Sequence, residues 1–217
     1  MIRGVGLSKS YGSLEVLKNV DVSIKKNEIV SITGPSGAGK STLLQLLGTL
    51  DTPQNGQVVY GDQDLSKLNA KAIAKYRNEN IGFIFQFHHL LPEFSALENV
   101  SMPAFISGIG KSEATSRAEE LLDLIGLGDR LEHKPNELSG GEQQRVAVAR
   151  ALMNKPRVIF ADEPSGNLDT ENAQDLHNLF MRLRDEFDQT FVIVTHNQDL
   201  AKMADRTIKM KDGKILD

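Results

Sequence analysis

The stretch from Gly34 to Ser41 combines glycines, a lysine and a serine at a spacing that can hold a chain of phosphates. It reads Gly-Pro-Ser-Gly-Ala-Gly-Lys-Ser and matches the pattern Gly-x-x-x-x-Gly-Lys-Ser/Thr. Glycines let successive backbone N–H groups turn toward phosphates, and the start of a following helix adds partial positive charge. In this pattern the lysine, here Lys40, meets the β and γ phosphates, and the Ser41 hydroxyl ligates Mg²⁺. These residues, called the phosphate loop below, predict a nucleoside triphosphate site.

Two adjacent carboxylates, Asp162 and Glu163, follow an apolar run that begins at Val158. Ligands of open parallel sheets bind at the carboxyl ends of strands, so Asp162 is expected to ligate the metal. Glu163, one position further on, is then free to act as the general base that deprotonates water. An acidic pair after a strand is also a common helix cap, and its combination with the phosphate loop is what favours catalysis.

A second anion site is indicated by Ser139, Gly140 and Gly141, which begin a helix within the segment Leu-Ser-Gly-Gly-Glu-Gln-Gln-Arg. A serine hydroxyl and free N–H groups at a helix start can bind phosphate, and glycines permit close backbone approach. The alternative is an ordinary capping box between Ser139 and Glu142. One nucleotide within a single chain would not need both loops, so we expect these residues to face a nucleotide held by a partner subunit.

The strands that position these residues are expected in four short apolar runs: Ile29 to Thr33, Ile81 to Phe85, Val158 to Ala161 and Phe191 to Thr195. Each run is rich in β-branched or aromatic residues and nearly free of charge, which is typical of strands covered on both faces in a parallel sheet. The first twenty-five residues instead alternate with period two, which predicts half-exposed antiparallel strands. The tail from Ile208 to Ile215 predicts a hairpin with an Asp-Gly turn.

Helices are expected between these strands, for example after Thr170, where apolar residues recur at helical spacing. The stretch from Ser95 to Leu152 contains no convincing strand, and two Ser-x-x-Glu boxes mark helix starts at Ser95 and Ser139. We therefore expect one α/β domain over residues 1–217, with a parallel core sheet, an N-terminal antiparallel β subdomain and an all-helical insertion. The helical subdomain is expected at about residues 88–152.

Composition narrows the possible functions. The chain has 217 residues, a net charge of −4 and no cysteine, which excludes disulfides, cysteine-zinc sites and thiol nucleophiles. No basic excess predicts nucleic acid binding, and no apolar run approaches the roughly 18 residues of a membrane span. The start of the chain lacks the pattern of a signal peptide, so a cytosolic location is expected.

The motifs together resemble the ATPase subunits of ATP-binding cassette (ABC) transporters over essentially the whole chain. The segment Leu-Ser-Gly-Gly-Glu-Gln-Gln-Arg is similar to the family signature, and its combination with Val-Ile-Phe-Ala-Asp-Glu-Pro is highly specific. The resemblance implies a P-loop NTPase fold, ATP with Mg²⁺, and a head-to-tail dimer of two copies with ATP between them. It assigns nucleotide contacts to Tyr11, Gly34, Pro35, Ser36, Gly37, Ala38, Gly39, Lys40, Ser41, Thr42, Ser139, Gly140, Gly141 and Asp169.

Several of these roles come from the resemblance alone. It implies that Tyr11 stacks on adenine, that Gln86 touches Mg²⁺ and the attacking water, and that His196 contacts the γ phosphate. It also implies that Asp169 ends a loop coupling the two sites of the dimer. The implied catalytic set is Glu163, His196 and Gln86, and the implied metal set is Ser41, Gln86 and Asp162. Structural alternatives stay open: a hairpin tyrosine, a solvated glutamine, a helix-capping histidine and a helix-starting aspartate.

The segment from Phe85 to Val100 is unusually apolar for a loop, so its side chains are expected to pack inward or to meet a partner. It resembles the ATPase subunits of lipoprotein-releasing systems, and Glu-Pro-Ser-Gly-Asn-Leu-Asp resembles the wider group of macrolide exporters and the cell-division ABC ATPase. The resemblance implies a peripheral subunit on the cytoplasmic face of the bacterial inner membrane, bound to integral membrane subunits, whose ATP hydrolysis releases outer-membrane-directed lipoproteins. The alternatives are a macrolide-type exporter and the cell-division complex. A fused membrane domain is not expected, because the chain ends soon after Asp212.

Overall fold

The computed structural model describes residues 1–216 and contains two sheets. The larger one has six strands in the order β10-β9-β3-β8-β7-β6, and all except the edge strand β10 run parallel. Its strands are β3 (Ile29–Thr33), β6 (Ile81–Phe85), β7 (Val158–Asp162), β8 (Phe191–Val194), β9 (Arg206–Lys211) and β10 (Lys214–Leu216). The smaller, antiparallel sheet has the order β2-β1-β4-β5. Its strands are β1 (Ile2–Tyr11), β2 (Leu14–Ile24), β4 (Asn55–Tyr60) and β5 (Gln63–Asp64).

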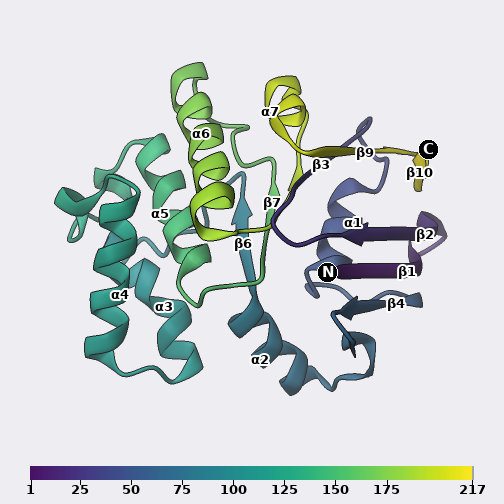
Figure 1. The fold of residues 1–217 in the computed structure, drawn as a ribbon, viewed down its shortest axis with the longest axis horizontal. Helices are drawn as coiled ribbons and strands as arrows, with labels where there is room; N and C mark the ends of the chain where they lie inside the picture. The colour runs from purple at the N-terminus through teal and green to yellow at the C-terminus, as the bar shows by residue number, and fades with distance from the viewer. Residues whose placement is uncertain (217) are drawn as a thin grey trace.

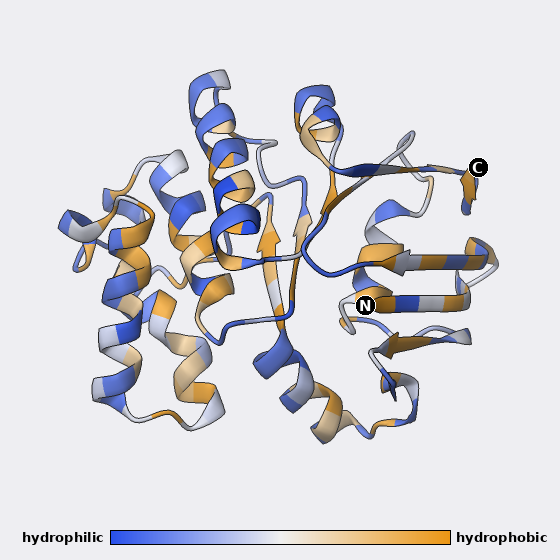
Figure 2. Cartoon of the chain, viewed as in Figure 1, coloured by the Kyte–Doolittle hydropathy of each residue, from blue (hydrophilic) through white to orange (hydrophobic). Residues whose placement is uncertain are grey.

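Both faces of the parallel sheet are covered, as the unbroken apolar runs predict. Along β7, Val158 and Phe160 belong to one apolar core, whereas Ile159 and Ala161 belong to another. Because side chains alternate across a strand, the two cores lie on opposite faces of the sheet. Figure 2 shows hydrophobic residues concentrated in β6 and β7. The strands are therefore held rigidly at the centre of the molecule, and their ends can position side chains accurately.

Seven α-helices surround these sheets in the described part of the chain: α1 (Lys40–Leu47), α2 (Ala70–Asn80), α3 (Ala96–Ser107), α4 (Lys111–Leu124), α5 (Gly140–Leu152), α6 (Thr170–Phe187) and α7 (Gln198–Met203). Figure 1 shows α3, α4 and α5 at the end of the molecule opposite the antiparallel sheet. Residues 88–152 contain helices and loops but no strand. Both capping boxes form, at Ser95 and at Ser139, with reciprocal bonds to Glu98 and Glu142.

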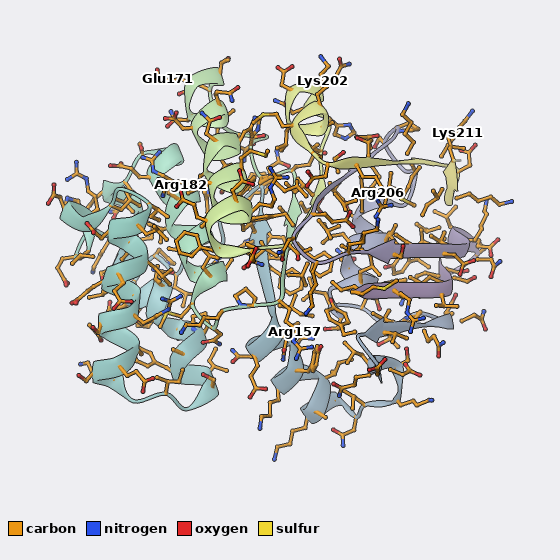
Figure 3. The ribbon with its side chains drawn as sticks, viewed as in Figure 1. Arg157, Glu171, Arg182, Lys202, Arg206 and Lys211 are labelled. Atoms are coloured by element: carbon orange, nitrogen blue, oxygen red, sulfur yellow. The ribbon has the colours of Figure 1, made fainter. Side chains whose placement is uncertain are left out.

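The hairpin of β9 and β10 lies directly behind the phosphate loop. Its turn has left-handed backbone at Asp212 and Gly213, as an Asp-Gly hairpin requires, and the Gly213 N–H donates to Ala38 O. A side chain at Gly34 would lie 2.1 Å from Met210 O, so only glycine lets the loop pack this closely on β9. At the other end of β9, Arg206, labelled in Figure 3, donates to the Ser23 carbonyl of β2.

The predicted fold class, a P-loop NTPase with a parallel core sheet, an antiparallel β part and a helical insertion, is confirmed. The helix α2 and the strands β4 and β5 were not predicted. No helix within residues 1–216 is long and apolar enough to cross a membrane.

Candidate active site

The phosphate loop wraps around the side chain of Lys40. The Lys40 ammonium donates to the carbonyl oxygens of Gly34 and Pro35, at 2.9 Å each, and the residue is only 7% exposed. Helix α1 begins at Lys40, after Gly39 with a φ of 94°. At Gly37, φ is 77° and the space beside the Cα is open. The loop therefore places a buried cation and a helix start around an open concavity, which suits a phosphate chain.

A hydroxyl and a carboxylate meet next to this loop. The Ser41 hydroxyl donates to Asp162 Oδ1 at 3.1 Å, from the start of α1 to the end of β7. Burial raises the pKa of Asp162, and the hydrogen bond from Ser41 and the charge of Lys40 partly offset this effect. A hydroxyl and a desolvated carboxylate are the hard oxygen donors that Mg²⁺ prefers, and a cation there would stabilise the charged carboxylate. The residues present therefore fit a magnesium ion.

Glu163 is held in a strained backbone conformation beside Asp162. Its φ is 48°, a region that bulky residues seldom adopt, and its N–H donates to Val194 O of the neighbouring strand. The backbone N–H of His196 donates to Glu163 Oε2 at 3.1 Å. The His196 ring lies 3.3 Å from Oε1 but makes no hydrogen bond with it, so this buried oxygen has no hydrogen-bond partner. One Glu163 carboxylate oxygen is thus held by the His196 N–H, and the other is buried against the His196 ring without a hydrogen bond.

Gln86 follows β6 and is bound by the loop that follows Glu163. Its side-chain amide donates to Asn167 Oδ1 at 2.9 Å, and the Asn167 amide donates to the Gln86 carbonyl at 3.2 Å. A side chain at Gly166 would lie 2.9 Å from Gln86 Nε2. Gln86 therefore contacts the loop that precedes Asp169. Its side chain forms a hydrogen bond there rather than with Ser41 or Asp162.

Asp169 ends that loop and begins α6. It is the N-cap of the helix, accepting from the backbone N–H and the side-chain amide of Asn172. These bonds lower the pKa of Asp169, with the backbone bond as the largest cause. Asp169 therefore caps α6, as the structural alternative predicts. The loop that precedes Asp169 lies at the molecular surface.

The signature segment, defined here as Ser139, Gly140 and Gly141, begins α5. The Ser139 hydroxyl accepts from Glu142 N, and the Glu142 carboxylate accepts from Ser139 N, which lowers the pKa of Glu142. Gly140 has open space beside it, whereas a side chain at Gly141 would lie 2.2 Å from Asn172 Oδ1. Gly141 thus lets α5 approach α6, and the side of Gly140 is left free for a ligand.

This asymmetry predicts different outcomes for two alanine substitutions. Gly141→Ala is expected to lower the melting temperature by several degrees, because the Asn172 side chain must move and its amide hydrogen bond to Asp169 Oδ2 is lost. Overpacking of this kind costs about 1–3 kcal/mol. Gly140→Ala is the matched control and should leave the melting temperature within about 2 °C, since alanine fits the open space and favours helix. Thermal unfolding followed by circular dichroism measures both, and equal shifts would contradict the packing role of Gly141.

Tyr11 lies at the end of β1 with its ring 48% exposed. Its hydroxyl donates to Asp51 Oδ2, and Asp51 also accepts from the Lys9 ammonium, which lies 5.3 Å from the Tyr11 ring centroid. Burial and the nearby Asp51 raise the pKa of Tyr11. Tyr11 is therefore not a core side chain, and its ring is anchored at its hydroxyl end with the Lys9 ammonium over one face.

The parallel strands bring most of the predicted residues to one edge. Strands β3, β8, β7 and β6 are adjacent in the sheet, and the phosphate loop, His196, Asp162 and Gln86 follow their carboxyl ends in that order. Among the described residues, no hydrogen bond joins the signature segment to the phosphate loop. Sequence reasoning did not assign roles to Asn167, Asn172 or Asp51. Asn167 lies inside the Glu-Pro-Ser-Gly-Asn-Leu-Asp motif, and this position was the one sequence signal that could have indicated its role.

A phosphate loop, a carboxylate pair at a strand end and a separate glycine-rich helix start define an ATP-binding cassette, and the chain belongs to the ABC transporter family. The family model described as "ABC transporter" matches residues 17–166. The chain is thus an ATP-binding ATPase subunit of the ABC type. A relative named "Lipoprotein-releasing system ATP-binding protein LolD" from Bacteroides thetaiotaomicron is 62% identical over 215 residues, covering 99% of each chain. A protein of the same name from Cytophaga hutchinsonii is 55% identical, covering 100% of this chain and 99% of the relative.

Solved structures agree with this assignment. The dimeric ATP-binding cassette MJ0796 bound to ADP and Pi matches with a TM-score of 0.91 and 40% identity, covering 100% of this chain and 97% of that one. The expected family and ATPase activity are therefore confirmed. The roles of individual residues stay predictions.

Proposed function

We propose that this chain is the ATP-hydrolysing subunit of a bacterial inner-membrane complex that releases outer-membrane-directed lipoproteins. The observation that carries the proposal is identity of 55–62% over nearly the full length to relatives named for lipoprotein release. The subunit would act at the cytoplasmic face of the membrane through integral membrane partners. The chain itself would bind and hydrolyse the ATP that drives lipoprotein release.

In the proposed reaction, the phosphate loop binds ATP and Lys40 neutralises the β and γ phosphates. Ser41 and Asp162 would hold Mg²⁺, which supplies charge stabilisation for the phosphates when bound. Glu163 Oε1 would accept the proton of the attacking water after the His196 ring that covers it swings away, while the backbone N–H of His196 keeps the other oxygen in place. Water attack forms the new P–O bond and breaks the bond to ADP, so the products are ADP and inorganic phosphate.

The signature segment is proposed to bind the ATP held by a second copy of the chain. The dimeric state of the related cassette MJ0796 supports that arrangement. So does the lack, within residues 1–216, of any hydrogen bond between this segment and the phosphate loop of its own chain. ATP would then hold the closed dimer together, and hydrolysis would release it. The work arises from the higher affinity of ATP for the closed dimer than for the open one.

Exposed apolar residues of the segment that follows Gln86 and of α3 are proposed to bind the membrane subunits, and they are called the docking surface below. The most exposed are Phe87, at 66%, and Ile106, at 70%, and Leu91, Phe94 and Phe105 are exposed as well. A cavity of about 430 Å³ between α2, β6, α3 and α5 is lined by Ile106, Phe85 and Pro103. Apolar groups gathered on a surface favour burial by a partner. The predicted inward packing holds for Leu90, which contacts the core, but not for Phe87.

Copurification tests this proposal. Tagged Glu163→Gln protein with Mg-ATP is expected to capture, from detergent-solubilised native membranes, integral subunits with large periplasmic domains together with lipoproteins. The comparison variant is the same protein carrying Ile106→Asp. It should recover at least tenfold less of the membrane subunits, while the isolated variant still binds ATP.

Mass spectrometry of the captured chains distinguishes the alternatives. Recovery of a drug exporter or a division-site membrane protein would reject the lipoprotein role. Equal capture by the Ile106→Asp variant would reject the docking surface.

A further inference from the structure

Three side chains join helix α5 to the end of β6 and the segment that follows it. Gln144 and Arg150 belong to α5, and His88 belongs to the segment. Gln144 lies near the carbonyl oxygen of Phe85, the last residue of β6, with its Nε2 at 3.4 Å. Arg150, in the last turn of α5, donates to the carbonyl oxygens of His88 and His89, at 2.7 Å each. The His88 ring returns to the start of the same helix, where its Nε2 lies 3.1 Å from Gly140 O. The residues after Gln86 are thus bound to both ends of α5.

In the hydrogen bond between His88 and Gly140, the histidine ring must be the donor. A carbonyl oxygen accepts hydrogen bonds and cannot donate them, so the His88 Nε2 must carry the hydrogen. Burial lowers the pKa of His88, and the charge of Arg150 contributes to this, which favours a neutral ring at pH 7. His88 is therefore a neutral donor whose position is fixed by the two bonds of Arg150.

This bond controls the orientation of a group that the signature segment needs. The peptide unit between Gly140 and Gly141 is planar, so its carbonyl oxygen and the Gly141 N–H point in opposite directions. Helix α5 begins at Gly140, so Gly140 O also accepts the helical bond from the Gln144 N–H, and the bond from His88 adds a second restraint on the direction of the Gly141 N–H. The Glu142 N–H is already used by Ser139 Oγ, which leaves the N–H groups of Gly140 and Gly141 as the open donors of this helix start.

We propose that His88 is a positioning residue that aims the signature segment at the nucleotide of the partner subunit. The inference rests on the proposed dimer.

The test compares His88→Leu with His88→Gln, both in the Glu163→Gln chain. Leucine removes the donor, whereas the glutamine amide can place an N–H at a similar distance. Both keep the bond from Arg150, because it is made to the backbone. With Mg-ATP, we expect His88→Leu to weaken dimerisation about 25-fold in sedimentation equilibrium, from roughly 5-fold at each of two interfaces if the Gly141 N–H no longer points at the partner's nucleotide and one hydrogen bond is lost there. His88→Gln should restore dimerisation to within about 3-fold.

Two further readouts separate positioning from a general structural effect. Binding of a fluorescent ATP analogue to the dilute monomer should be unchanged in both variants, because the signature segment acts only across the dimer. The melting temperature without nucleotide should fall by no more than a few degrees in His88→Leu, which loses one intrachain hydrogen bond. Unchanged dimerisation of His88→Leu, an equal loss of monomer nucleotide binding, or no restoration by glutamine would overturn the inference. If the parent Glu163→Gln chain binds the analogue but forms no dimer, the proposed dimer fails and the inference fails with it.

Discussion

Replacing Glu163 by glutamine is expected to reduce ATP hydrolysis by at least 100-fold while ATP binding persists. A general base typically contributes about 10²–10⁴-fold, and an amide oxygen cannot accept the proton of water at neutral pH. The substitution keeps the size of the side chain and its bond from the His196 N–H, so the loop geometry should survive. Release of inorganic phosphate under saturating Mg-ATP measures the rate.

The same variant is expected to form an ATP-dependent dimer, because binding continues and the step that opens the dimer is blocked. Glu119→Gln, an equivalent change at an exposed position of α4, is the matched control and should keep the parent rate and the parent oligomeric state. A Glu163→Gln chain that hydrolyses ATP at the normal rate would remove Glu163 from the role of base.

Replacing Lys40 by methionine is expected to abolish the stabilisation of the fold by ATP. A ligand present at 100 times its Kd stabilises the native state by about 2.7 kcal/mol, which raises the melting temperature by several degrees. Without the ammonium, the phosphate loop retains N–H donors but loses its one buried cation, so affinity should fall at least 100-fold and this shift should disappear. Differential scanning fluorimetry with and without Mg-ATP measures the effect.

The nucleotide-free Lys40→Met protein should unfold within a few degrees of the parent. The methionine fills a similar volume, and Pro35, one of the two residues that accept from Lys40, lies at the exposed surface where water can replace the lost donor. Lys75→Met, on the exposed face of α2, serves as the control and should retain the full ATP-induced shift. A Lys40→Met protein that ATP still stabilises as strongly as the parent would contradict the assignment of the phosphate loop.

Elements with one dominant local signal were predictable from the sequence. The four core strands appeared as unbroken apolar runs because both faces of the sheet are buried, and the helix starts at Ser95 and Ser139 appeared because their capping partners lie three residues away. The site was predictable for a related reason. Parallel strands end at one edge, so polar residues that follow such strands converge without any further information.

Other features depended on partners distant in the chain. Helix α2 has no buried residue, so it shows no apolar stripe, and β4 becomes a strand by pairing with β1. The left-handed backbone of Glu163 is imposed by the neighbouring strand, and no residue type at that position signals it. The contact of His88 with Gly140 joins two motifs that are separate in sequence, so only the folded arrangement reveals it.

The close packing of the phosphate loop on the β9–β10 hairpin also bears on how the protein is made. The loop lies near the start of the chain, yet Met210 and Gly213 form its rear wall. During synthesis on the ribosome, the Gly34 segment emerges long before this wall exists. We therefore expect nascent chains to acquire affinity for ATP late in translation, which would spare incomplete subunits from occupying nucleotide or pairing with finished ones.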